Sequence, residues 1–154
     1  MKRIQTEMDI DAPPEAVWDA LTDVSAYSEW NPQTVWASGE VREGGEVALR
    51  VEPSRSRPAT LKARVETVEP ERTLVWTARL PVPGLFAARH AFELEPRPDG
   101  GTRLRNTETL SGLLVPFVVR KDAERDYHAM NRALADRSKS VAVGGSDGAQ
   151  KRAA

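Results

Sequence analysis

The sequence contains no cysteine and only two histidines among its 154 residues. Without cysteine, disulfide bonds and thiolate metal sites are excluded. The histidines form no HExxH or other metal-binding motif, so a catalytic zinc site is not expected. The chain also has no GxGxxG motif and no phosphate-binding loop. We therefore expect neither a metal nor a cofactor.

An excess of charge of one sign and long apolar runs are missing as well. Lysine and arginine number 22 against 23 acidic residues, so no basic excess predicts a nucleic-acid partner. The most apolar run, LLVPFVV, is far shorter than the roughly 20 residues that a membrane-spanning helix needs. The N-terminal MKRIQTEMDI lacks the apolar segment of a secretory signal. These absences predict a cytoplasmic protein without a membrane span.

The length and composition fit one globular domain. Hydrophobic residues make up 40% of the chain and charged residues 29%, which is typical of a folded protein. Periodic patterns extend to about residue 138. The segment that follows contains glycine and serine and little to bury. We predict one domain over residues 1–138 and a disordered tail over residues 139–154.

Hydrophobic periodicity predicts an α+β fold. A strand over residues 3–10 precedes two short helices in DAPPEAVWDALTD and VSAYSEW, and the prolines of the first suit a helix start. Between residues 34 and 112 the period is two, with REGG, EPER and RPDGG as chain reversals. A helical stripe then predicts a long helix over residues 115–138. We expect a curved seven-stranded antiparallel sheet wrapped around this C-terminal helix.

An internal cavity follows from this architecture. A strongly curved sheet around one helix leaves space between the two unless large side chains fill it. Several residues that are predicted to point inward are small, including Ala37, Ala63, Ala78 and, on the helix, Ala123. Small residues on both walls favour a pocket, although a tightly packed core can use them too.

His90 stands on an apolar face in the stretch FAARHAFELEP, in which it alternates with Phe92. If the next strand pairs so that residue numbers sum to 198, His90 lies opposite Glu108, on the same face as Asn106. A carboxylate beside an imidazole favours its charged form and orients the ring. We expect these three residues to form a polar end of the cavity, with His90 and Glu108 as candidate acid–base residues. The alternative is that His90 and Glu108 only satisfy each other's hydrogen-bonding groups in the core.

Two aromatic residues are further candidates for the cavity wall. Trp76 points inward and could stack on a flat ligand, and the hydroxyl of Tyr127 could reach the cavity from the last helix. Core packing is the alternative role for both residues. The complete predicted lining is Trp76, His90, Phe92, Asn106, Glu108 and Tyr127.

The element order and several stretches resemble the helix-grip fold of the START-like superfamily, in particular bacterial SRPBCC proteins of the polyketide cyclase/dehydrase type. The stretches that carry this resemblance are IDAPPEAVWDALTDVSAYSEWNP, LVWTARLPVPGLFAARHAFELEP, GGTRLRNTETLSGLL and AMNRALADR. They lie between about residues 3 and 137. The resemblance implies the fold and a ligand cavity. It implies no single activity, because one fold hosts many functions.

Three functions are therefore open. The first is the binding of a small hydrophobic or aromatic ligand. The second is a cofactor-independent cyclase or aromatase in which His90 or Glu108 moves a proton. The third is an interaction protein of the Hsp90-activator kind, although the outer residues show no concentrated patch. The apolar loops over residues 81–86 and 112–117 can form a lid, the contact of a homodimer, or a packed pair.

Overall fold

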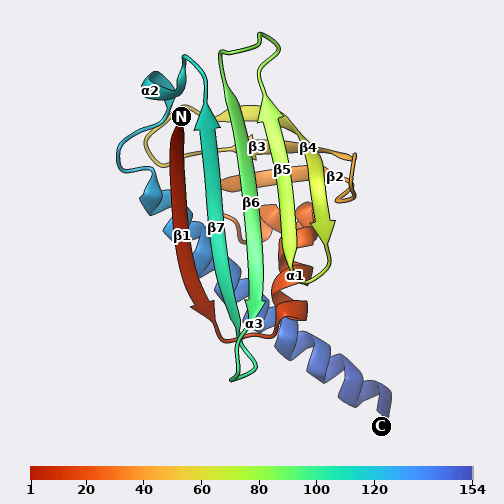
Figure 1. Cartoon of the computed structure of the whole chain (residues 1–154). Helices are drawn as coiled ribbons and strands as arrows, with labels where there is room; N and C mark the ends of the chain where they lie inside the picture. Colours follow the sequence, from red (N-terminus) through yellow and green to blue (C-terminus); the bar gives the residue numbers. More distant parts are fainter. Residues whose placement is uncertain (154) are drawn as a thin grey trace.

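The computed structural model describes the backbone of residues 1–153 and the side chains of residues 1–143. The chain begins with a strand, a helix and a 3-10 helix, continues with six strands, and ends with two helices (Figure 1). The elements are β1 (Lys2–Ile10), α1 (Pro14–Thr22), η1 (Val24–Glu29), β2 (Thr34–Gly39), β3 (Glu46–Val51), β4 (Ala59–Glu69), β5 (Thr73–Arg79), β6 (Ala87–Pro96), β7 (Thr102–Ser111), α2 (Val115–Val118) and α3 (Glu124–Ala153).

The seven strands form one antiparallel sheet in the order β1-β7-β6-β5-β4-β3-β2. The sheet is strongly curved, so β2 and β3 cross behind the upright strands, and α3 runs diagonally across the concave side (Figure 1). Bulges in β2 and in β4 interrupt the regular register and sharpen the bend. The predicted helix-grip α+β fold is confirmed.

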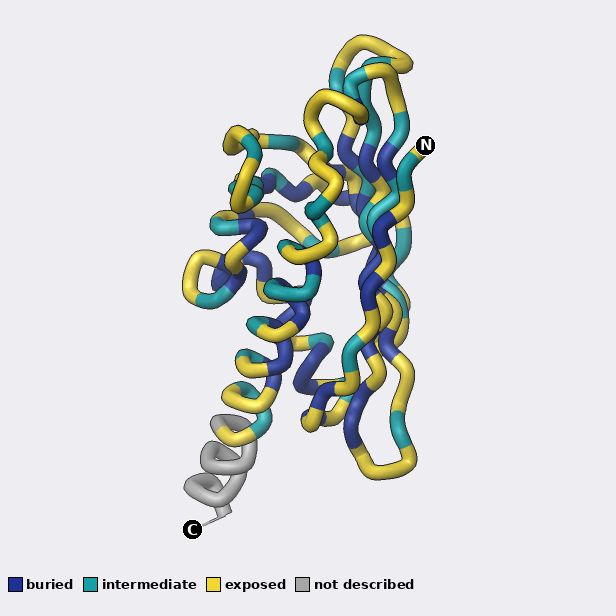
Figure 2. Tube along the Cα trace, turned by 90° about the vertical axis from the view of Figure 1, so that its left-hand side faces the viewer, coloured by how far each residue is buried: buried dark blue, intermediate teal, exposed yellow. Residues whose placement is uncertain are grey.

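The hydrophobic core lies between the sheet, α1 and α3. Figure 2 shows the buried residues of α3 along the side that faces the sheet. Helices α1 and α3 contact each other there, and Leu134 of α3 is completely buried. Most of the largest fully buried side chains are apolar, and the set comprises Tyr27, Phe92, Ile10, Leu21, Leu74, Leu104, Met130, Leu134, Val17, Val47, Val65 and Asn106.

The prediction of one helix over residues 115–138 is wrong at its start. The chain forms the short helix α2, leaves helical geometry at Val119, which is extended, and resumes as α3 at Glu124. Pro116 stands at the start of α2, where the missing backbone donor costs nothing. Glu124 and Asp126 stand in the first turn of α3, where acidic residues favour a new helix start. The break leaves the irregular segment 119–123 between α2 and α3.

Beyond residue 138, α3 continues, and Val141 and Ala142 are partly buried against the main core. Much of the segment 139–154 lies outside the described side chains, so its disorder stays a prediction. No helix in the part of the chain that the structure describes is long and apolar enough to cross a membrane.

A candidate ligand-binding cavity

A cavity of about 850 Å³ lies between the concave face of the sheet and the segment from α2 to the start of α3. This volume is within the range of sites that hold drug-sized ligands. Ala78 and Ala88 are direct cross-strand partners on β5 and β6, and both face the cavity. Their small side chains leave space that larger residues would fill. The apolar walls comprise Leu49, Val51, Leu61, Trp76, Ala78, Leu80, Phe86, Ala88, Leu110, Leu114, Phe117, Val118, Val119 and Ala123.

The polar end of the cavity contains His90 and Glu108. The register of β6 with β7 places these two residues directly opposite each other, as the sequence predicts. Nδ1 of His90 lies 3.1 Å from Oε2 of Glu108, and each side chain is only 12% exposed. Both residues line the cavity. The imidazole on this apolar face therefore belongs to a carboxylate–imidazole pair at the edge of a hollow.

A chain of hydrogen bonds holds His90 from the other side. Nε2 of His90 lies 2.6 Å from Oδ1 of Asn106, whose Nδ2 donates to Oδ1 of Asn131 at 2.8 Å. Nδ2 of Asn131 in turn donates to Oγ1 of Thr6 at 2.8 Å. The two asparagines and the threonine are buried. This chain links β6, β7, α3 and β1 through the centre of the fold and fixes the orientation of the imidazole ring.

The direction of these bonds indicates which nitrogen of His90 carries a hydrogen. Because Asn106 presents its oxygen to His90, Nε2 of His90 carries a hydrogen and donates it. In a neutral imidazole, Nδ1 then holds a lone pair that faces Oε2 of Glu108. Two lone pairs at 3.1 Å repel each other. The contact of Nδ1 with Oε2 is therefore an ion pair only when the ring of His90 is protonated.

The surroundings of Glu108 favour the protonated form of its carboxyl group. Burial raises the pKa of the Glu108 carboxyl group above its ordinary value, and the positive charge of protonated His90 partly opposes that rise. In addition, Oε2 of Glu108 is fully buried and has no hydrogen-bond partner among the described residues, although Nδ1 of His90 lies 3.1 Å away. This oxygen therefore lies beneath the surface of the cavity wall.

Tyr127 brings a hydroxyl group to the same end from α3 and lines the cavity. Its ring packs edge-on against His90, with the ring centres 5.9 Å apart. Burial, followed by the nearby Glu108 carboxylate, raises the pKa of Tyr127 well above 10. The side chain of Gln33 opposes that rise by hydrogen bonding to the hydroxyl. At neutral pH the hydroxyl therefore stays protonated and can donate.

Gln33 was not predicted from the sequence. It precedes β2, is 8% exposed, and lines the cavity. Its Oε1 has no hydrogen-bond partner in the described part of the chain. The only signal in the sequence is a polar residue beside Trp30 and Pro32, where an irregular connection gives no face assignment. Because Gln33 lies outside the strands, their alternation does not predict the direction of its side chain.

The other predicted residues divide between the cavity wall and the layer beneath it. Trp76 lines the cavity and packs edge-on against His90 and Phe92. Phe92 stacks on His90 with ring centres 4.1 Å apart, but it is fully buried and does not line the cavity. Asn106 is also fully buried and away from the wall. Phe92 and Asn106 therefore lie in the layer beneath the wall, and the role of the six predicted residues in ligand binding stays a prediction.

One side of the cavity mouth is formed by the two apolar loops that precede β6 and follow β7. The amides of Leu113 and Leu114 donate to the carbonyls of Gly84 and Leu85, each at 3.0 Å. The loops therefore pack on each other, which is one of the alternatives that the sequence leaves open. Phe117 lines the cavity and is 84% exposed, so its ring stands at the opening. The predicted homodimer contact at these loops stays a prediction.

The opposite side of the mouth is formed by the connection between β3 and β4. Nη1 of Arg55 lies 2.7 Å from Oδ2 of Asp122, and the amide of Ser54 donates to Oδ2 of Asp126 at 3.3 Å. Both contacts join this connection to the segment at the start of α3. All four residues line the cavity, so the opening is bridged by exposed polar contacts. In the described part of the chain, no three metal-ligating side chains cluster.

A seven-stranded antiparallel sheet that grips a C-terminal helix around an apolar cavity defines the START-like class of proteins. The chain belongs to the polyketide cyclase/dehydrase and lipid transport family, whose model matches residues 1–139. A comparison with the curated proteins gives no match. The resemblance to this family that the sequence suggests is thus confirmed.

Solved structures show the same fold. A START superfamily protein from Mycobacterium smegmatis is 18% identical, with a TM-score of 0.73 over 90% of this chain and 98% of the other. Protein MLL2253 from Mesorhizobium loti is 23% identical, with a TM-score of 0.66 and the same coverage. The di-domain ARO/CYC StfQ from the steffimycin biosynthetic pathway is 13% identical, with a TM-score of 0.66 over 94% of this chain and 51% of that one.

Proposed function

We propose that this protein binds a small hydrophobic or aromatic ligand in the cavity between the sheet and α3, without a cofactor. The observation that carries the proposal is a cavity of about 850 Å³ whose inner walls are largely apolar, with His90 and Glu108 at one end and charged residues at the mouth. Such a site takes the apolar body of a ligand out of water and uses the polar end to orient it. Membership of a family described as including lipid transport supports the same conclusion.

Binding of the neutral dye Nile red tests this proposal. We expect saturable binding with a rise in fluorescence, because the dye would leave water for an apolar site. The double substitution Ala78→Trp and Ala88→Trp fills the cavity and should weaken binding at least tenfold. Ala48→Trp is the matched control, because Ala48 alternates with the buried Val47 and Leu49 and lies on the opposite face. Equal binding by all three proteins would contradict the proposal.

Native mass spectrometry of the protein purified from its own host complements the dye. We expect an additional mass that is retained at low collision energy and lost at high energy. The filled-cavity double variant should arrive without that mass. A retained mass of equal abundance in the double variant would place the ligand outside the cavity.

A second candidate function is cofactor-independent proton transfer on a bound ketone, as in a cyclase or aromatase. The observation that favours it is the imidazole–carboxyl pair at 3.1 Å beside the cavity. One of the relatives in structure carries ARO/CYC in its name. Hydrogen exchange at the methyl group of 2-acetylnaphthalene in D₂O, followed by NMR, tests this function. Catalysis by the wild type that is lost in His90→Gln would support it, and exchange at the buffer rate would exclude it for this ketone.

A further inference from the structure

Three segments that are far apart in the sequence meet at one end of the sheet. Lys2 at the start of β1 pairs with Leu110 of β7. Ala87 at the start of β6 pairs with Arg79 of β5 on one side and with Ser111 of β7 on the other. Figure 1 shows the N-terminus, α2 and the loop between β5 and β6 together at this end. We call these segments the loop end, which comprises residues 1–3, 79–87 and 111–121.

The loop end carries most of the large hydrophobic side chains that the fold leaves exposed. In the described part of the chain seven such residues are exposed, and two of them, Trp36 and Val143, lie elsewhere. The five at the loop end are Met1, Val82, Leu113, Phe117 and Val118. Single exposed hydrophobic residues are ordinary on a protein surface, whereas a group of them marks an interaction site.

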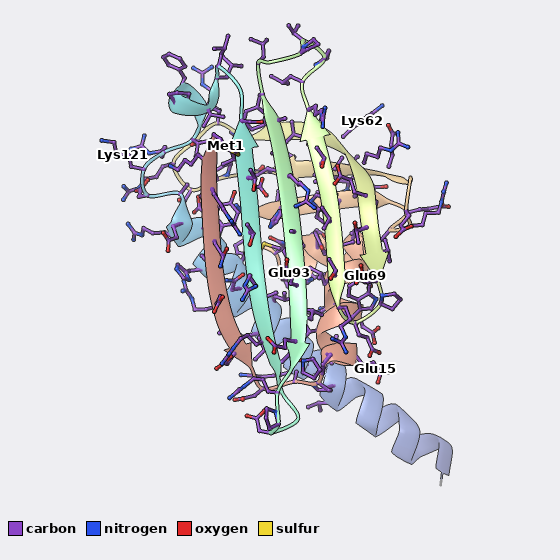
Figure 3. All side chains as sticks on the ribbon, in the orientation of Figure 1. Met1, Glu15, Lys62, Glu69, Glu93 and Lys121 are labelled. Carbon is purple, nitrogen blue, oxygen red and sulfur yellow. The ribbon has the colours of Figure 1, made fainter. Side chains whose placement is uncertain are left out.

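The loop end is also basic, although the whole chain is close to neutral. Its three segments contain five cationic residues and no acidic residue, namely Lys2, Arg3, Arg79, Arg120 and Lys121. Among the described residues, only Arg120 of these five lies within ion-pair distance of a carboxylate, that of Asp122 at 3.6 Å. Figure 3 shows Lys121 toward this end of the molecule and Glu15 and Glu69 toward the opposite end. The other four cations are therefore available to a negatively charged partner.

Three of these cations surround an open pocket of about 440 Å³ between β1 and the start of α3. Nζ of Lys2 donates to the carbonyl of Arg120 at 3.0 Å, which holds the beginning of β1 beside residues 120 and 121. The pocket is lined by Lys2, Arg3, Ile4, Gln5, Lys121 and Glu124. Three cations and one carboxylate leave it positively charged, and lysine and arginine both bind phosphate groups. This part of the loop end suits a phosphate-containing group.

The combination of apolar and basic side chains distinguishes between the partners that could cover this surface. A second copy in a two-fold contact would place the same cations of both chains in one interface, where like charges repel. A nucleic acid offers phosphates but no apolar region for Leu113 and Phe117, which are 74% and 84% exposed. A bilayer with anionic lipids offers both, because its headgroups attract basic residues and its acyl chains accept apolar ones.

We propose that the loop end docks this protein on the surface of an anionic lipid bilayer. Val82, Leu113 and Phe117 enter the boundary between headgroups and acyl chains, and the cations contact the phosphates. Phe117 and Val118 also line the cavity, so its mouth opens beside the docked surface. The proposal does not depend on ligand binding, because Val82 and Leu113 are not among the cavity-lining residues.

Sedimentation with sucrose-loaded vesicles tests the docking. We expect the full chain to bind vesicles of phosphatidylcholine that contain about 30% phosphatidylglycerol at least tenfold more tightly than vesicles of phosphatidylcholine alone. Sodium chloride at about 0.5 M should weaken this binding, because salt screens exposed charges. Equal binding to both kinds of vesicle, or binding to neither, would overturn the proposal.

A charge-reversed variant locates the docking surface. Arg3→Glu together with Lys121→Glu should weaken binding to the anionic vesicles at least tenfold, since each basic residue near such a surface contributes about fivefold. Neither residue lines the cavity, so the affinity for Nile red should match that of the wild type and show that the variant is folded. Arg72→Glu together with Lys139→Glu is the matched control, because Arg72 precedes β5 at the opposite end of the sheet and Lys139 lies far along α3. Equal loss of binding in the two double variants would contradict the assignment to the loop end.

A fluorescent label tests whether the apolar side chains enter the bilayer. The chain has no cysteine, so Leu113→Cys accepts a single NBD group. We expect its emission to increase and to shift to shorter wavelength when anionic vesicles are added, whereas NBD on Arg72→Cys should not change. The same shift produced without vesicles by a higher protein concentration would show that a second copy covers the loop end. A shift with duplex DNA but not with vesicles would show a nucleic-acid partner, and either result would overturn the proposal.

Discussion

Glu108 places its carboxyl group beside His90 in the wall of the cavity. In the unfolded chain this group ionises near its ordinary pKa of 4.5, whereas burial raises its pKa in the folded chain. The folded protein therefore holds a proton that the unfolded chain releases. The resulting contribution to stability is fully present below about pH 4.5 and is lost as the pH rises through the folded pKa.

This linkage predicts how Glu108→Gln changes the pH dependence of stability. The unfolding free energy of the wild type should fall relative to that of the variant as the pH rises above about 4.5. At pH 8 we expect the variant to be more stable by on the order of 1 kcal/mol, because the amide needs no deprotonation in a buried site. Urea denaturation at intervals between pH 4 and pH 8 measures this. Parallel curves for the two proteins would contradict the linkage.

Asn106 is expected to determine which nitrogen of His90 carries a hydrogen. In the wild type, ¹⁵N NMR of His90 should show a protonated Nε2. Asn106→Leu removes the acceptor and should change the ¹⁵N shifts of the ring while costing about 1–3 kcal/mol, because it also leaves Oδ1 of Asn131 without its donor. Asn131→Leu is the control. It breaks the same chain one step farther away and should cost similar stability with the Nε2 signal retained.

A fully buried asparagine is notable here because no strand pattern distinguishes a residue that lines a cavity from one that lies beneath it. Asn106 and Glu108 alternate on the same face of β7, yet only Glu108 reaches the cavity. Their difference in depth depends on where α3 covers the sheet. The sequence therefore predicts the face of a residue but not its layer.

The strands show which features of the fold hydrophobic periodicity predicts. The pairing of His90 with Glu108 follows from two strands of clear alternation and a short turn of fixed length, and the register confirms it. The helix boundaries were harder, because the apolar stripe of residues 119–134 continues through the break between α2 and α3. Val119 and Ala123 of that break line the cavity and also pack against the smaller core cluster that contains Leu110. An apolar stripe predicts which side of a segment is buried, but it does not predict whether the backbone is helical throughout.

The two apolar loops at the mouth depend on the close approach of Gly112 to Leu85. Gly112 has a φ of +115°, and a Cβ there would lie 2.3 Å from the carbonyl oxygen of Leu85. Gly112→Ala should therefore cost about 1–3 kcal/mol or more, and it should separate the loops. Gly84→Ala is the control, because Gly84 also has a positive φ but a Cβ would meet nothing within 4 Å. Thermal denaturation distinguishes the two variants, and equal costs would exclude the steric explanation.

The contact of Arg55 with Asp122 predicts an effect on exchange rather than on stability. Because the pair is exposed, Arg55→Gln should change the unfolding free energy by less than about 1 kcal/mol. It should, however, speed Nile red dissociation several-fold, since the contact bridges the cavity mouth. Arg42→Gln removes an equally short exposed pair with Glu40, which is not among the cavity-lining residues, and serves as the control. Stopped-flow dilution measures the rates, and identical rates in the two variants would contradict a role at the mouth.

On the scale of the whole molecule, packing and binding rely on different side chains. None of the largest fully buried side chains in the described part of the chain lines the cavity. Leu134→Ala should accordingly destabilise the protein by about 2–5 kcal/mol, since it leaves a hole in the main core. Below the melting temperature its dissociation constant for Nile red should match that of the wild type. A tenfold change in that constant would show that the core and the cavity are coupled.

This division has a consequence for how such chains diverge. Substitutions of wall residues can change the shape of the cavity and the ligands that it binds. The fully buried core residues, which stabilise the fold, can stay the same. Descendants can thus acquire new chemical preferences one residue at a time without passing through an unstable ancestor. Proteins with fewer than one residue in four in common then retain a single backbone plan.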